Sequence, residues 1–93
     1  METITEQKLT KYFSVTGKAL KKVKIVDKEK GEIVFDMASR YYSDAEHFSE
    51  KGDKVNAFAC LNYAHGWLDA GARLGLFDVG GDNKLFTVDK QNF

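Results

Sequence analysis

Two pairs of side chains in this sequence have the spacing of metal ligands. His65 and Asp69 are four residues apart, and Asp44 and His47 are three apart, so each pair would share one face of a helix. Zinc needs three or four close ligands, but Cys60 falls on the apolar side of its predicted helix. We therefore expect no metal centre and no other cofactor. We interpret His65 as a half-buried ring that hydrogen-bonds to its neighbours.

Arg40 and His47 form a second arrangement, because seven residues of helix bring both side chains to one face. This spacing resembles that of ribonucleases of the HEPN superfamily, in which an arginine and a histidine act on a phosphodiester. The resemblance implies an RNA-binding or ribonuclease domain, with Arg40 and His47 as catalytic residues. Asp36 and Asp44 lie four residues on either side of Arg40 and favour ordinary surface ion pairs. The nuclease is therefore the alternative hypothesis.

A third group of polar residues follows one narrow stripe of the predicted helix over residues 54–74. Asp69 and Arg73 have the spacing of a helical ion pair. If the tail or another subunit covers part of this stripe, its polar groups become contacts that fix the packing register. We predict that these groups orient the helix and form the rim of a partner site. The candidate binding residues are Asn62, Tyr63, His65, Trp67, Asp69 and Arg73.

Length and composition limit the class of protein. The chain has 93 residues, no net charge, one cysteine and no proline. These values predict a single globular domain over residues 1–93 with no internal disulfide. There is no apolar run of signal-peptide or membrane-spanning length, so we expect a cytoplasmic protein that does not enter membranes.

Charge is unevenly distributed along the chain. Residues 1–24 contain six lysines and two glutamates, a net charge of +4. This pattern is typical of a solvated helix face, although it would also suit a phosphate or an acidic partner. In the RNA hypothesis, Lys18 and Lys22 would assist Arg40 and His47. No arginine lies among these lysines, and the aromatic residues there, Tyr12 and Phe13, belong to the apolar face of the helix, which weakens the case for nucleic acid.

Hydrophobic periodicity predicts three helices, over about residues 4–24, 32–51 and 54–74. Thr3 and Glu6 have the spacing of a capping box, and the polar connection after the first helix would end at Gly31. Gly52 suits a helix C-terminus and Asp53 the next N-cap. The turn between them would make the second and third helices antiparallel.

Apolar residues cover well over half the circumference of the third predicted helix, so this helix is central or forms an interface. Ala57, Ala64 and Gly71 are seven residues apart and predict a groove for bulky residues of the second helix, namely Tyr41, Tyr42 and Phe48. In the tail, residues 76–93, the patterns Leu76–Val79 and Leu85–Val88 flank a Gly-Gly turn signal. They predict a short hairpin or two extended pieces.

The stretches RYYSDA (residues 40–45), Gly52-Asp53 and YAHGWLDAGARLGLF (residues 63–77) resemble the archaeal domain-of-unknown-function 357 family. The resemblance covers about half of the chain. It implies an archaeal source and an up-and-down bundle of three helices. It implies no activity, because none is assigned to the family.

These observations predict an all-α, antiparallel three-helix bundle with a short extended or hairpin tail. We expect a non-enzymatic protein-interaction or adaptor module that binds a protein partner or a second copy of itself. The motivating feature is the third helix, which is too apolar around its circumference for two neighbours alone.

Overall fold

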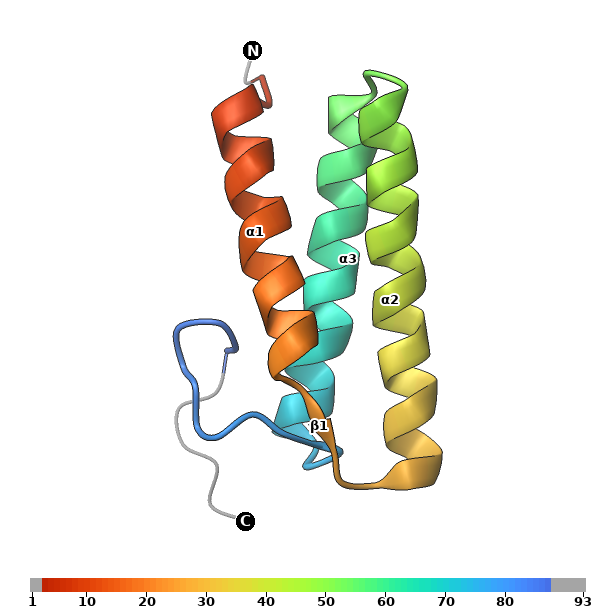
Figure 1. Cartoon of the computed structure of the whole chain (residues 1–93), viewed down its shortest axis with the longest axis vertical. Coiled ribbons are helices and arrows are strands. Elements are labelled where there is room, and N and C mark those ends of the chain that lie inside the picture. Colours follow the sequence, from red (N-terminus) through yellow and green to blue (C-terminus); the bar gives the residue numbers. More distant parts are fainter. Residues whose placement is uncertain (1–2, 88–93) are drawn as a thin grey trace.

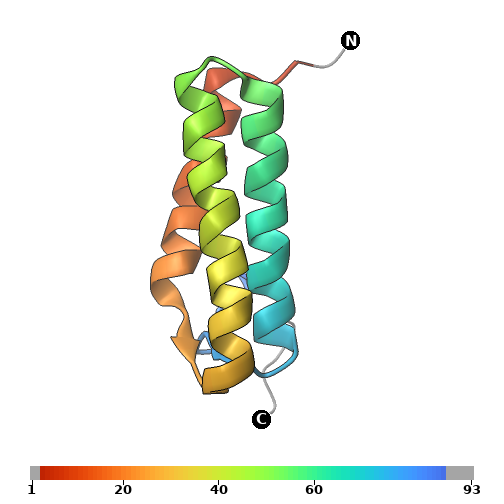
Figure 2. The same ribbon diagram turned by 90° about the vertical axis from the view of Figure 1, so that its right-hand side faces the viewer.

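Three antiparallel helices make up most of the molecule. The computed structural model describes residues 3–87, in which α1 (Glu6–Lys22), α2 (Lys28–Glu50) and α3 (Lys54–Arg73) run alternately down, up and down (Figure 1). The predicted all-α, up-and-down bundle is confirmed. Helices α2 and α3 lie side by side along their length (Figures 1 and 2), and α1 packs mainly on α3.

Local capping signals set most helix ends. The side chain of Thr5 accepts the backbone N–H of Lys8, so α1 begins two residues after its predicted start. Asp53 caps α3 as predicted. Gly52 and Gly75 follow α2 and α3 with φ angles of 77° and 74°, a conformation that glycine adopts without steric cost.

The predicted start of α2 at residue 32 was wrong. The helix begins at Lys28, because Asp27 caps it by accepting a backbone N–H three residues later at 3.0 Å. Gly31 therefore lies in the first turn of α2, where a Cβ would come within 3.1 Å of the carbonyl oxygen of Leu76. The glycine permits this close crossing of the chain and does not end a loop.

The tail is extended as predicted, but its strand has a different partner from the one expected. Strand β2 (Phe77–Asp78) pairs antiparallel with β1 (Lys24–Ile25), which joins α1 to α2. The chain then turns at Gly80 and Gly81, which both have positive φ angles. Of the two predicted forms of the tail, the extended one is confirmed for the described part, in which β2 pairs with β1; Val88 lies outside the described residues.

The core contains small residues between the helices and large residues from the tail. Ala57, Ala64 and Gly71 are buried along one line of α3, as predicted. At Gly71, however, the occupant is Phe77 of the tail; Tyr42 and Phe48 pack further along, near Ala57. The tail side chains packed into the lower core are Phe77, Val79 and Phe86, each at most 2% exposed.

The third helix runs unbroken from Lys54 to Arg73. It is the central scaffold, because α1, α2 and β2 all pack on it. Within residues 3–87, no helix combines the length and the apolar character needed to cross a lipid bilayer.

Candidate functional site

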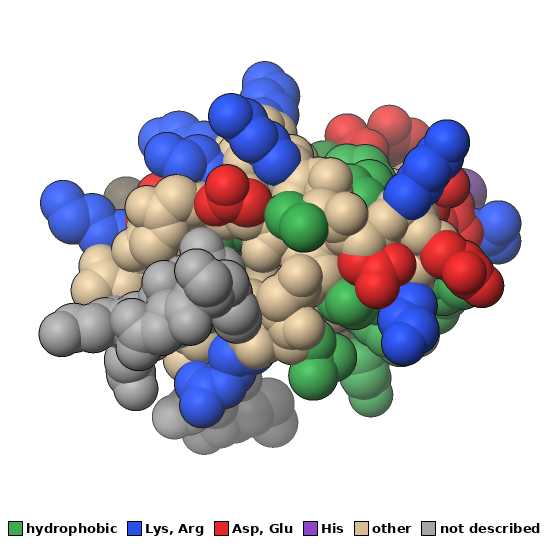
Figure 3. Space-filling view, turned by 90° about the horizontal axis from the view of Figure 1, so that it is seen from below, with side chains coloured by type: hydrophobic (Ala, Val, Ile, Leu, Met, Phe, Trp, Pro, Cys, Tyr) green, Lys and Arg blue, Asp and Glu red, His purple; other side chains and the backbone are tan. Residues whose placement is uncertain are grey.

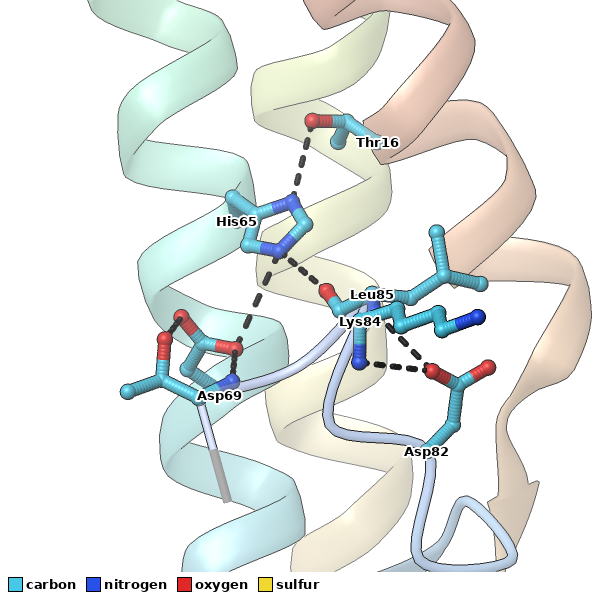
Figure 4. Close-up of polar contacts among 7 residues, drawn as sticks. Thr16, His65, Asp69, Asp82, Lys84 and Leu85 are labelled. Carbon is cyan, nitrogen blue, oxygen red and sulfur yellow. Dashed lines mark hydrogen bonds and ion pairs between the residues drawn. The ribbon is translucent and has the colours of Figure 1, made fainter. Parts of the chain in front are cut away.

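His65 is the central residue of a polar cluster that joins α1, α3 and the tail (Figure 4). Its Nε2 lies 2.6 Å from the carbonyl oxygen of Leu85, and its Nδ1 lies 3.1 Å from Oγ1 of Thr16. Because a carbonyl oxygen can only accept, Nε2 carries the hydrogen, and in the neutral ring Nδ1 accepts the Thr16 hydroxyl. Thr16 is only 2% exposed, so His65 satisfies a buried polar group.

Asp69 fastens the tail one turn further along α3. Its carboxylate accepts the backbone N–H of Thr87 at 2.8 Å and the hydroxyl of Thr87 at 3.1 Å. Further back in the tail, Asp82 accepts the backbone N–H groups of Leu85 and Lys84, and these bonds lower the pKa of its carboxyl group. The tail is thus held by its own turn and by α3.

These contacts assign His65 and Asp69 a structural role. The prediction of a half-buried, hydrogen-bonded His65 is confirmed, since its side chain is 22% exposed. The predicted pair of Asp69 with Arg73 is not among the ion pairs of residues 3–87. Instead, Nε2 of His65 lies 3.8 Å from the carboxylate of Asp69. Among the same residues, no three His, Cys, Asp or Glu side chains lie close enough to share a metal ion.

Replacing His65 by alanine is expected to lower the free energy of unfolding by about 1 kcal/mol, because two hydrogen bonds are lost and Thr16 loses its partner. Amide hydrogen exchange near Leu85 should accelerate more than exchange in α2. Urea denaturation and exchange measured by NMR would test this. Asn62→Ala is the control, because Asn62 is exposed and its side chain donates to the carbonyl of Phe58 in its own helix. An equal loss in both variants would contradict the role of His65.

Two hollows flank the solvent side of α3. The first, of about 400 Å³, lies between α1 and α3 and is lined by residues that include Lys11, Tyr12 and His65. The second, of about 380 Å³, lies between α2 and α3 and is lined mainly by Tyr41, Tyr63, Trp67 and Ala70. Asn62 and Gly66 line both hollows, so they form the ridge between them.

Tyr63 belongs to the exposed wall of the second hollow. Its ring stacks on that of Tyr41, with centroids 5.3 Å apart and planes at 20°, yet 62% of its surface remains exposed. Gly66 is exposed, and a Cβ at this position would meet nothing within 4 Å. A glycine inside a helix costs about 1 kcal/mol relative to alanine, and here no neighbour in the described chain requires it.

The exposed side of α3 is therefore more apolar than the sequence predicted. Tyr63, Ala70 and Leu74 belong to the wide apolar arc of this helix, and all three are exposed, because α1 and α2 both pack on the opposite side. Between residues 55 and 74 the only exposed charged side chain of α3 is Arg73. We call the outer face the six exposed residues that follow one stripe of α3: Val55, Ala59, Tyr63, Gly66, Ala70 and Leu74.

The two sides of the molecule that are seen from below differ in surface chemistry (Figure 3). Seen from below, hydrophobic side chains reach the surface mostly on the half of the molecule away from the tail (Figure 3). Lysine and arginine side chains project from the surface on both halves. The apolar surface seen in this view thus lies mainly on the side formed by α2 and α3.

The proposed nuclease pair lies outside both hollows. Arg40 is exposed and its Nε bonds to Asp36 at 2.8 Å, which is the surface ion pair that its spacing favoured. His47 is exposed and its ring meets the edge of Phe48. Neither residue lines the two hollows described above, so the structure adds no substrate-binding surface to this pair.

Cys60 has the surroundings of a packing residue. It packs against the core cluster of Leu9, Ala45, Ala57 and Leu61. Burial, followed by the negative charges of Asp44 and Asp53, raises the pKa of its thiol. A raised pKa lowers the fraction of thiolate, which is the nucleophilic form. Cys60 is therefore a poor candidate for covalent catalysis.

Sequence reasoning missed three participants in these sites. Thr16 was not singled out, and Tyr41 was expected to pack into the groove along α3. The carbonyl of Leu85 is a backbone group and has no signal in side-chain chemistry. A turn signal before Leu85 was visible, but nothing local indicated that the turn would reach α3.

A family model described as "Protein of unknown function (DUF357)" matches residues 11–77 of the chain. No curated protein and no solved structure matches it.

Proposed function

The chain belongs to the DUF357 family, and we propose that it is a non-catalytic interaction module that binds a helix on the outer face of α3. The observation that carries this proposal is the exposed, almost uncharged stripe from Val55 to Leu74. Large hydrophobic side chains at this exposure are usually covered in a complex when they form a continuous surface.

The shape of this surface suits a helix. The outer face extends over 20 residues, and the hollows on either side provide space for side chains of a partner. A helix that docks along such a groove is recognised through side chains spaced three and four residues apart. Tyr63 and Trp67 supply the aromatic anchors that protein interfaces favour.

A display library of amphipathic helical peptides tests this proposal. We expect selected peptides to bind the wild-type chain and to lose about tenfold or more in affinity on Ala70→Arg, because the new charge would be buried in the interface. Ser43→Arg is the matched control, since Ser43 is an exposed residue of α2. Failure to enrich any peptide, or equal binding to both variants, counts against a helix-docking role.

A further inference from the structure

We propose that the helix bound on the outer face is α3 of a second copy, running antiparallel. This inference rests on the proposed docking role of that face and names its partner. The evidence is the order of side chains along the stripe, the unexplained glycine within it, the charge of the chain and the area available.

The outer face has the same pattern from either end. Its residues are separated by four, four, three, four and four positions. When two copies of this stripe run antiparallel about a two-fold axis between Tyr63 and Gly66, each residue meets one of suitable size. Val55 then faces Leu74 of the partner, and Ala59 faces the partner's Ala70. A two-fold interface requires this kind of self-complementary surface.

The centre of this arrangement accounts for Gly66. The exposed ring of Tyr63 would lie over Gly66 of the partner, and the reverse contact follows by symmetry. Among the described residues, a Cβ added at Gly66 would meet nothing within 4 Å, and Tyr63 is 62% exposed. The missing side chain at one position and the bulky one at the other thus fit together between copies. Small residues at Ala59 and Ala70 would let the two helices approach closely.

Charge favours a second copy over a charged partner. The chain has no net charge at pH 7, so two copies do not repel each other strongly at long range. The outer face itself contains no ionised group, and Arg73 beside it is the only exposed charge on α3 between residues 55 and 74. Such a surface neither requires a partner of opposite charge nor selects one.

The available area fits a weak dimer. A stripe of 20 residues is about 30 Å long, and with its two hollows it is about 20 Å wide, which is two helix spacings. The two copies together would bury about 1,200 Å², the lower limit of stable interfaces. Weak and transient complexes lie at this lower limit, so we would look for association at chain concentrations from about 10 µM to 1 mM. The stripe itself is apolar and Lys11 and Asp69 line the first hollow beside it, so salt should weaken the contact only slightly.

Cysteine cross-linking tests the antiparallel register directly. In a Cys60→Ala chain, we would prepare Ala59→Cys and Ala70→Cys separately. In an antiparallel dimer, residue 59 of one copy lies about 16 Å along the helix from residue 59 of the other, and the same holds for residue 70. This distance is beyond the reach of a disulfide. Mixing the two proteins under mild oxidation should therefore give a cross-linked dimer, whereas neither protein alone should do so. A parallel dimer would instead cross-link each protein with itself, and that result would overturn the proposal.

Sedimentation of the intact wild-type chain from about 10 µM to 1 mM completes the test. We expect a monomer–dimer equilibrium that Ala70→Arg weakens about tenfold or more and Ser43→Arg leaves unchanged. A monomer throughout this range would overturn self-association. If helical peptides still bound that monomer in an Ala70-dependent way, the docking role would stand and only its assigned partner would be wrong. If neither peptides nor copies bound, both proposals would fail.

Discussion

Replacing Phe77 by alanine is expected to lower the free energy of unfolding by about 3–5 kcal/mol, the usual cost of removing a fully buried aromatic side chain. Phe77 is 1% exposed. Its ring meets the edge of Phe35 on α2, with centroids 6.3 Å apart, and lies against Gly71 on α3. Because Phe77 belongs to β2, which pairs with β1, the substitution would also loosen the connection between α1 and α2.

Urea denaturation followed by circular dichroism would measure this loss. Leu74→Ala is the control, since Leu74 is nearby in sequence and equally apolar but 72% exposed; its substitution should change stability by less than about 0.5 kcal/mol. Phe77→Ala should raise amide exchange throughout the tail. A loss of less than about 1 kcal/mol would show that the tail contributes little to the folded bundle.

The antiparallel α2–α3 hairpin was predictable because its signals are local. Asp53 caps the helix that follows it, Gly52 takes the positive φ angle that ends the helix before it, and Gly75 ends α3 in the same way. The start of α2 was predicted wrongly because the role of Gly31 depends on a contact distant in sequence, and not on a local signal. A glycine after a polar stretch suggests the end of a loop. At Gly31, however, the glycine is needed because the carbonyl oxygen of Leu76, which is distant in sequence, passes close to it. Local propensity is a weak guide where such a tertiary contact decides.

The candidate site was predicted as one surface and is divided into two. Helical periodicity placed Asn62, His65 and Asp69 on one stripe of α3, and the structure agrees. Periodicity does not say, however, which other part of the chain covers each residue. The tail covers His65 and Asp69 through Leu85 and Thr87. The exposed surface therefore consists mainly of Tyr63 and the other residues of the outer face.

The two glycines of α3, Gly66 and Gly71, show most clearly that helical periodicity does not reveal which residues are covered. Gly71→Ala should lower the free energy of unfolding by about 2–3 kcal/mol, because a Cβ there would lie 2.2 Å from Cε2 of Phe77 and overpacking outweighs the gain in helix propensity. The ring of Phe77 cannot move away easily, since it is buried on its other sides by the lower core.

Gly66→Ala should have the opposite sign and raise the free energy of unfolding by about 0.5–1 kcal/mol, because the helix gains propensity and the new methyl group meets nothing within 4 Å. Parallel urea titrations of both variants, at concentrations where the chain is monomeric, would measure the difference. In the dimer, the same methyl group would collide with the partner's Tyr63, so Gly66→Ala should stabilise the single chain and weaken its association. A variant that destabilised the monomer would mean that Gly66 has a contact within its own chain. A variant that left association unchanged would mean that Gly66 is not at the centre of the interface.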